Sequence, residues 1–448
     1  MQEPIISVSG LRGIIGESLT PEIAARFACA FAAGLPSGTV IITRDSRTTG
    51  SMFADAIRAG LCAIGRNVVD AGIAATPTTG VLIRARKLIG GIQISASHNP
   101  APYNGLKLFD AQGQVITADA GHLVIQRYRQ GDLPWVSHDR IGRLETGIDT
   151  TTAHLGRVLA LVDVDRIRQR RFRVLLDSNH GAGGILGRLL LEALGCEVEI
   201  LGEEPSGRFH HPPEPTAENL RDVCHEVVRH GASVGFCQDP DADRLAVISE
   251  LGQYIGEEYT LALCLDHVLQ HHQGAVVTNC STSRMAEDLA LKYRAPFFRS
   301  RVGEANVVAL MQLRNAVFGG EGNGGPIDPR VGFVRDSFVG MALILDAMAA
   351  SGKTVSQLVD AIPRYAICKD KTTLPPESVA SALLALERHF SAAKPDRLDG
   401  LRLDWPNQWL LIRSSNTEPI VRIIAESPAE SEARRLCDEA IRVIASSK

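Results

Sequence analysis

A serine and a histidine lie side by side where an apolar strand is expected to end. Ile92 and Ile94 can share one face of a buried strand. The Asn-Pro pair at 99–100 stops that strand, because proline lacks an N–H and disfavours helix in the residue before it. Ser97 and His98 are therefore held at the exposed end of a rigid element, where a serine beside a histidine is a candidate nucleophile. An Asn-Pro turn with ordinary capping hydroxyls is the alternative.

Three carboxylates alternate after a second expected strand at 233–236; they are Asp239, Asp241 and Asp243. Carboxylates packed this closely repel one another, and a hard divalent cation offsets the repulsion. An EF-hand loop does not fit, because its sixth position needs glycine and this chain has Arg244 there. Mg²⁺ suits the run better, since it takes few carboxylates and completes its shell with phosphate and water. An exposed acidic turn is the alternative, and Arg244 could orient the acids or contact a phosphate.

A glycine-rich loop follows a short strand expected at 315–318. Between 319 and 325 the only residues other than glycine are Glu321 and Asn323. We interpret the thin backbone as room for a ligand, with the two polar side chains as groups that bind hydroxyls. A flexible linker is the alternative.

A polar turn at 413–419 joins two strands expected at 409–412 and 420–425. Such a dense array of donors is typical of a phosphate site, and a polar hairpin turn is the alternative. The candidate phosphate-binding residues are Arg413, Ser415, Asn416, Thr417 and, on the second strand, Arg422.

Two basic residues could lie near the same reacting groups. Arg12 lies in a glycine-flanked run at 10–13, where a flexible backbone suits an arginine that reaches an anion. Lys107 follows an Asn-Gly pair at 104–105, a strong turn signal, and the hairpin could fold it over Ser97. A surface hairpin and a solvated strand lysine are the respective alternatives.

The elements that must position these residues alternate between strand and helix. Three times a short apolar strand ends in one of the candidate functional loops described above. This repetition predicts three similar α/β domains that present corresponding strand ends to a common cleft. The last segment differs and predicts a smaller α+β domain. We place the four domains at 1–150, 151–253, 254–368 and 369–448, with a hinge near 366–372.

Composition excludes other classes of protein. The net charge of −4 and the 5% aromatic content predict no nucleic-acid or membrane partner. No apolar run reaches the 18 residues of a membrane span, and no signal-like segment opens the chain. The nine cysteines show no CxxC spacing, so we expect reduced core residues and the cytoplasm as compartment. The oligomeric state is expected to be monomer or homodimer.

Taken together and in this order, the four loops resemble the α-D-phosphohexomutase family over essentially the whole chain. The resemblance implies a heart-shaped arrangement of four domains, one Mg²⁺ per chain, and a hexose 1,6-bisphosphate as intermediate and activator. It places Ser97 at the serine that carries the phosphoryl group and that contributes to the metal site with the three aspartates. His98 would orient the phosphoserine. Arg12 and Lys107 would form a basic pair at the reacting oxygen, with Lys107 as a carrier of the proton.

The activity implied by this resemblance is interconversion of hexose 6-phosphate and hexose 1-phosphate. The sugar stays open among glucosamine, N-acetylglucosamine, glucose and mannose, because two features depart from many members of the family. The sugar loop lacks their Ser-Gly-His, and the stretch at 279–283 lacks their sugar-binding lysine. A metal-dependent sugar-phosphate phosphatase and an inactive sugar-phosphate-binding regulator are the alternative functions.

Overall fold

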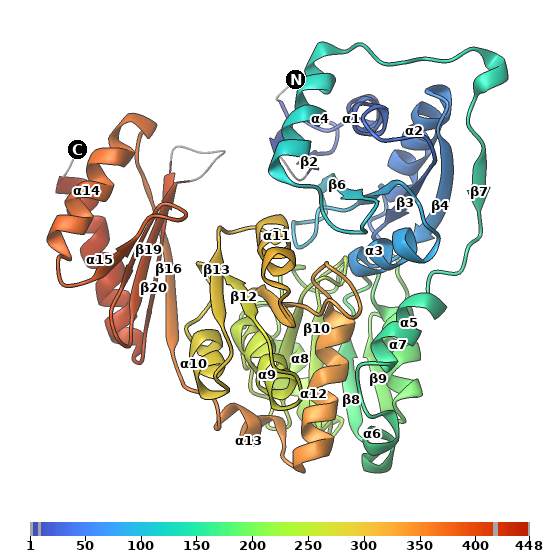
Figure 1. The fold of residues 1–448 in the computed structure, drawn as a ribbon. Helices are drawn as coiled ribbons and strands as arrows, with labels where there is room; N and C mark the ends of the chain where they lie inside the picture. The colour runs from blue at the N-terminus through green and yellow to red at the C-terminus, as the bar shows by residue number, and fades with distance from the viewer. Residues whose placement is uncertain (1–2, 8–9, 415–419, 447–448) are drawn as a thin grey trace.

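Four separate sheets divide the chain in the computed structural model, which describes residues 3–7, 10–414 and 420–446 (Figure 1). Three belong to α/β units and the fourth to an α+β unit, which confirms the predicted fold class. No helix among the described residues is long and apolar enough to cross a membrane.

The first domain contains a seven-stranded mixed sheet in the order β1-β2-β6-β5-β3-β4-β7. The strands β3, β4, β5 and β7 run parallel, whereas β6 runs antiparallel to both β5 and β2. Its strands are β1 (Ile5–Ser7), β2 (Gly10–Ile14), β3 (Thr39–Arg44), β4 (Asn67–Ile73), β5 (Gly90–Ile94), β6 (Tyr103–Asp110) and β7 (Leu144–Thr146). Its helices are α1 (Pro21–Ala33), α2 (Gly50–Ala63), α3 (Thr76–Ala85) and α4 (Ala118–Gln130).

The second and third domains each contain a four-stranded sheet, in the orders β11-β10-β8-β9 and β13-β12-β14-β15. The second comprises β8 (Arg173–Asp177), β9 (Glu197–Leu201), β10 (Val234–Gln238), β11 (Leu245–Ser249), α5 (Thr152–Leu159), α6 (Val164–Arg170), α7 (Gly184–Ala193) and α8 (Arg221–Arg229). The third comprises β12 (Val276–Asn279), β13 (Phe297–Ser300), β14 (Phe318–Glu321), β15 (Gly325–Ile327), α9 (Glu257–His271), α10 (Met285–Lys292), α11 (Glu304–Arg314), α12 (Ser337–Ser351) and α13 (Val355–Val359).

The three α/β domains repeat one hairpin. In each, a strand that pairs in parallel with a neighbour is followed by an antiparallel strand: β5 by β6, β10 by β11, and β14 by β15. The loop inside each hairpin is one of the three candidate functional loops predicted from the sequence. Equivalent topology therefore places the serine, acidic and glycine-rich loops at equivalent strand ends.

The last domain is a five-stranded antiparallel sheet in the order β16-β20-β19-β18-β17, with two helices. These elements are β16 (Ala366–Thr373), β17 (Lys394–Asp396), β18 (Leu401–Asp404), β19 (Trp409–Ser414), β20 (Ile420–Ser427), α14 (Val379–His389) and α15 (Glu430–Ser446). The hinge predicted near 366–372 falls within β16, which pairs with β20 along its whole length. Those residues are therefore part of this sheet, and the connection to the third domain precedes them.

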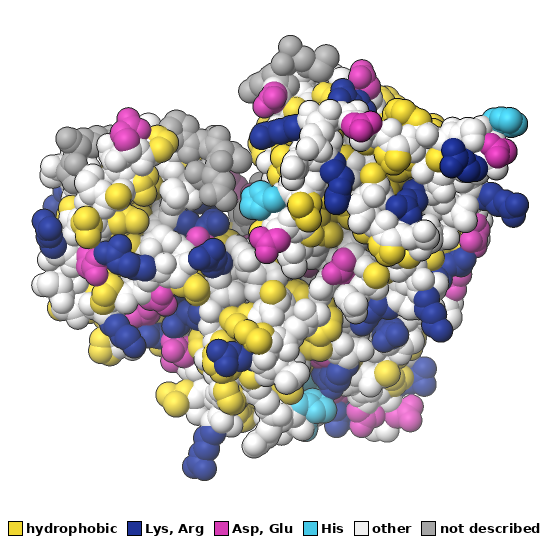
Figure 2. Space-filling model, turned by 45° about the horizontal axis from the view of Figure 1, so that its top comes forward, with side chains coloured by type: hydrophobic (Ala, Val, Ile, Leu, Met, Phe, Trp, Pro, Cys, Tyr) yellow, Lys and Arg dark blue, Asp and Glu magenta, His cyan; other side chains and the backbone are white. Residues whose placement is uncertain are grey.

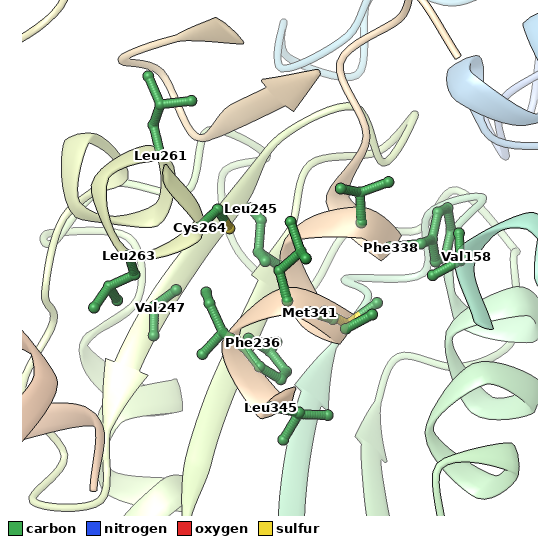
Figure 3. Packing of buried hydrophobic residues seen from close by; sticks show 14 of the residues in the cluster. Val158, Phe236, Leu245, Val247, Leu261, Leu263, Cys264, Phe338, Met341 and Leu345 are labelled. Atoms are coloured by element: carbon green, nitrogen blue, oxygen red, sulfur yellow. The ribbon is translucent and has the colours of Figure 1, made fainter. Parts of the chain in front are cut away.

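One continuous core joins the second and third domains. Helix α12 is buried at every position from Ser337 to Ala349, as expected of a helix that is apolar all round. Figure 3 shows Met341 and Leu345 of this helix among Phe236 and Leu245 of the second domain. The acidic loop and the glycine-rich loop are therefore supported by the same hydrophobic core.

Two local expectations are wrong. The Asn-Gly pair at 104–105 is not a turn but lies within β6, where Gly105 pairs with Arg12 on β2. A Cβ at Gly105 would lie 2.4 Å from the carbonyl oxygen of Leu11, so close strand packing explains this glycine. The strand expected at 315–318 instead begins at Phe318, because Asn315 ends α11 with a left-handed φ of 48°.

Candidate active site

Ser97 lies in the hairpin loop between β5 and β6 with a left-handed φ of 50°. Such a conformation is costly for a residue with a side chain and is common where function requires it. Its Oγ donates a hydrogen bond of 3.0 Å to Oδ2 of Asp239 and lies 3.3 Å from Nδ1 of His98. The predicted nucleophile and the predicted metal loop therefore meet, although 142 positions separate them.

The loop that carries Ser97 is held by two residues to which sequence reasoning assigned no role. Arg47 is 2% exposed and donates to the carbonyl oxygens of Ser97 and Asn99 at 2.7 and 2.6 Å. Asp45 accepts from Ser95 Oγ at 2.7 Å, and that oxygen accepts from the backbone N–H of Ser97. The signal was available: both residues follow β3, which runs parallel to β5, so their strand ends share one sheet edge.

The three aspartates of the acidic loop are fully buried, and one carboxylate oxygen from each lies within 4.8 Å of the others. Among the described residues, Oδ1 of Asp241 and Oδ1 of Asp243 have no hydrogen-bond partner. Burial and the two neighbouring carboxylates raise the pKa of Asp239 well above its ordinary value. Three converging buried carboxylates, two of which keep an oxygen without a hydrogen bond, fit a hard divalent cation such as Mg²⁺.

Two cations face the acidic loop from other domains. Nζ of Lys107 lies 2.7 Å from Oδ2 of Asp243, and Nη2 of Arg335 lies 2.7 Å from the same oxygen. Burial by itself would raise the pKa of Asp243, but Arg335 and Lys107 bring it well below its usual range. Burial likewise opposes the charge of Lys107, yet the neighbouring aspartates raise its pKa. Lys107 is therefore a charged donor here, and its predicted role as proton carrier requires these ion pairs to open.

The remaining residues predicted around the reacting oxygen are also close. Nη1 of Arg12 donates to Oδ1 of Asn99 in the serine loop at 2.8 Å. The backbone N–H of Arg244 donates to Oδ1 of Asp239 at 3.1 Å, and its Nε lies 3.9 Å from Oδ1 of Asp243 without a hydrogen-bond partner among the described residues. Burial, followed by Arg244 and Arg12, lowers the pKa of His98 to about 3. His98 is therefore neutral near pH 7 and a weak base, so it can accept a hydrogen bond beside Ser97.

Glu321 of the glycine-rich loop is tied to its surroundings by several donors. Its Oε2 pairs with Nη1 of Arg335 at 3.0 Å, and its Oε1 accepts from Nδ2 of Asn279 at 2.8 Å. Nδ2 of Asn323 lies 3.5 Å from Oε2. Arg335 thus connects this loop to Asp243 of the acidic loop, and sequence reasoning missed it. No local pattern marks Arg335, since its partners are 14 and 92 positions away.

Two glycines of this loop are required by different neighbours. A Cβ at Gly319 would lie 2.6 Å from both Sδ of Met311 and the carbonyl oxygen of Val277. Packing of α11 on the sheet therefore explains Gly319, rather than the approach of a ligand that the sequence suggested. At Gly322 a Cβ would lie 2.0 Å from a carboxylate oxygen of Glu258, a second acid that sequence reasoning did not select.

A cavity of about 210 Å³ lies between the third and last domains. One face of the last sheet borders this cavity, and alternate residues of each strand lie on that face. Figure 2 shows charged side chains around the hollow between the left lobe and the rest of the molecule. The lining residues are Glu258, Asn279, Ser281, Val302, Glu321, Gly322, Asn323, Lys369, Arg413, Arg422 and Ile424.

Arg413 and Arg422 of the predicted phosphate site thus line the same cavity as Glu321 and Asn323 of the glycine-rich loop. Lys369 on β16 adds a third cation that was not predicted. The alternation of buried and exposed residues along β16 could have indicated it, because Lys369 is exposed and its neighbour Cys368 is buried. The predicted residues Ser415, Asn416 and Thr417 lie outside the described residues.

Comparison with known proteins identifies the family. Models of the phosphoglucomutase/phosphomannomutase alpha/beta/alpha domains I, II and III match residues 4–134, 152–252 and 257–365. The model of the phosphoglucomutase/phosphomannomutase C-terminal domain matches residues 368–443.

The chain belongs to the phosphoglucomutase/phosphomannomutase family.

Relatives in this family match over nearly their whole length. The chain is 33% identical over 440 residues to a probable phosphoglucosamine mutase from Methanopyrus kandleri, covering 97% of this chain and 96% of the relative. It is 35% identical over 445 residues to a phosphoglucomutase/phosphomannomutase from Thermococcus kodakarensis, covering 97% of each. A crystal structure of a putative phosphomannomutase from Thermus thermophilus superposes with a TM-score of 0.85 at 25% identity, over 99% of both chains.

Membership in the phosphohexomutase group confirms the resemblance read from the sequence. It favours a mutase, an isomerase that transfers a phosphoryl group, over the phosphatase and the inactive regulator. The relatives carry different sugar names, so family membership leaves the sugar open.

Proposed function

We propose that this phosphohexomutase interconverts hexose 6-phosphate and hexose 1-phosphate through a phosphoryl group carried on Ser97. The observation that supports it best is the hydrogen bond of 3.0 Å from Ser97 Oγ to Asp239, because it joins the nucleophile to the acidic cluster. The bond from phosphorus to Ser97 Oγ breaks as a new bond to the free sugar hydroxyl forms, and the hydroxyl proton is released. A second transfer returns the other phosphoryl group of the hexose 1,6-bisphosphate to Ser97.

Asp239, Asp241 and Asp243 are the residues that would hold Mg²⁺, with Ser97 as a fourth contributor. Mg²⁺ would neutralise charge that develops on phosphoryl oxygens. Arg12 and Lys107 are the chain's own cations near this position, and both can donate hydrogen bonds to an anionic oxygen. His98 is neutral and can accept a hydrogen bond beside Ser97, which suits the role of orienting the phosphoserine, while Lys107 remains the proposed carrier of the proton.

The other end of the substrate would occupy the cavity between the third and last domains. Arg413, Arg422 and Lys369 supply positive charge for the distal phosphate, and Glu321 and Asn323 supply groups for sugar hydroxyls. Ser415, Asn416 and Thr417 remain proposed phosphate ligands on the strength of the sequence. The nine cysteines are all free, which agrees with the reducing cytoplasm that we propose as the compartment.

The test is conversion of the 1-phosphates of glucosamine, N-acetylglucosamine, glucose and mannose, with Mg²⁺ and a trace of the matching hexose 1,6-bisphosphate. The expected result is the corresponding 6-phosphate without stoichiometric release of inorganic phosphate. Steady phosphate release without isomer would establish the phosphatase instead. Binding without turnover of any sugar would establish the regulator.

A further inference from the structure

The cavity between the third and last domains has basic residues on one side and acidic residues on the other. The last domain contributes the cations Lys369, Arg413 and Arg422, whereas the third domain contributes the carboxylates Glu258 and Glu321. A hexose monophosphate has one anionic end and neutral hydroxyls, so the cations have an evident partner. Binding of neutral hydroxyls alone does not require two acidic side chains.

The two carboxylates differ in what surrounds them. Glu321 already pairs with the guanidinium of Arg335 and accepts from Asn279. Glu258 accepts only a backbone hydrogen bond, 2.9 Å from the N–H of Ser283, among the contacts of the described residues. No lysine, arginine or histidine of the described chain forms an ion pair with it. Desolvation raises the pKa of Glu258 to about 8, with Lys369 too weakly coupled to cancel the effect.

Glu258 is nevertheless positioned by the fold. It lies in the first turn of α9, and its carboxylate rests against the backbone of the sugar loop at Gly322, where any Cβ would overlap it. Gly322 stands between Glu321 and Asn323, so the acid is placed directly beside the groups assigned to the sugar. Ionising an acid in such a cavity without a cation is costly, and a ligand that carries a cation would offset that cost.

We propose that Glu258 forms a subsite for the ammonium group of an amino sugar, so that glucosamine phosphate is the preferred substrate. The proposal rests on the mutase function proposed above. The subsite discriminates by charge: an ammonium group pairs with the carboxylate, whereas the hydroxyl of glucose or mannose and the acetamide of N-acetylglucosamine bring no charge. Cation binding also favours the ionised form of the acid and so offsets the desolvation that raises its pKa.

The decisive variant is Glu258→Gln, because glutamine has the shape of a protonated glutamic acid and can still accept from Ser283. If Glu258 pairs with an ammonium group, kcat/KM for glucosamine 1-phosphate falls on the order of 10- to 100-fold, while that for glucose 1-phosphate changes less than about threefold. If Glu258 instead binds a hydroxyl as a neutral acid, both substrates keep their kcat/KM. The matched control is Glu287→Gln, which removes a carboxylate of the same domain that pairs with Arg299 and does not line the cavity.

The wild-type protein provides a second measurement that does not depend on the folding of a variant. Calorimetry is expected to give a Kd for glucosamine 6-phosphate at least about tenfold below that for glucose 6-phosphate. Equal affinities, or a Glu258→Gln variant that loses both substrates equally, would overturn the ammonium subsite while leaving the mutase intact. Absence of turnover with every hexose phosphate would instead overturn the proposed function.

Discussion

Nη2 of Arg335, in the third domain, donates a hydrogen bond of 2.7 Å to Oδ2 of Asp243 in the second. Through Nη1 the same guanidinium reaches Glu321 at 3.0 Å, and its Nε lies 3.4 Å from Glu304. One buried side chain therefore links the acidic loop to the sugar loop. Because the planar guanidinium presents several donors in fixed directions, it sets the geometry of both loops together.

Replacing this link should cost both stability and activity. In Arg335→Met the carboxylates of Asp243, Glu321 and Glu304 lose a buried partner, and loss of one member of a buried ion pair costs about 3–5 kcal/mol. We expect a lower melting temperature from the lost ion pairs and, because the acidic loop and the sugar loop lose the group that sets their geometry, a kcat/KM reduced by at least about 100-fold. Arg330→Met is the control, since Arg330 pairs with Asp328 outside the acidic cluster. A variant within threefold of the parent in kcat/KM would show that the link is dispensable.

Ser97→Ala should abolish the mutase reaction by several orders of magnitude, because no other hydroxyl is held against Asp239 among the described residues. Intact-protein mass spectrometry should find one phosphate on part of the purified wild-type protein and none on the variant. Ser95→Ala is an informative comparison, since Ser95 Oγ donates its hydrogen bond to Asp45 and not to Asp239. Full activity of Ser97→Ala would refute the assignment.

Removal of one aspartate should weaken metal binding without unfolding the protein. Asp241→Asn relieves repulsion within the cluster, and an asparagine oxygen can still accept from Thr76, whose Oγ1 lies 2.6 Å from Asp241 Oδ2. We expect the melting temperature without metal to be maintained, the Kd for Mg²⁺ to rise and kcat to fall with it. Calorimetric titration and kinetics at several Mg²⁺ concentrations check this. Undiminished activity after exhaustive chelation would contradict a role for the metal.

The unphosphorylated protein should lose stability through His98 as the pH falls. The pKa of His98 is lowered to about 3 in the fold, so below the ordinary value near 6.5 the unfolded chain binds a proton that the folded chain does not. Linkage then predicts a loss of about 2 kcal/mol between pH 7.5 and pH 5. His98→Gln should remove this part of the pH dependence. Parallel melting curves of the parent and the variant at both pH values provide the measurement, and identical slopes would disprove it.

Local sequence patterns were sufficient for the three repeated loops. Ser97 before an Asn-Pro pair, Asp239 to Asp243 in alternation, and Glu321 between glycines each combine a strand end with residues of one chemistry. The resulting fold class and family are confirmed. Such signals are readable because a turn and the groups that it presents lie within a few residues of one another.

The same local rules failed where packing overrode them. Asn104 and Gly105 form part of a central strand because neighbouring backbones on both sides pair with it, and a hydrogen-bonded strand outweighs the turn preference of two residues. The thin backbone at Gly319 likewise reflects the helix above it.

How the loops are joined follows from the packing of the domains and not from local patterns. Arg335 and Glu258 carry no distinctive neighbours in the sequence, yet one links two domains and the other lines the sugar cavity. Arg47 follows a strand end, but its hold on the serine loop depends on the pairing of β3 with β5. Arg335 and Asp243 are 92 positions apart, and Arg47 and Ser97 are 50 apart. Such partners meet only when the chain packs, and their separation along the sequence leaves no local pattern that marks them.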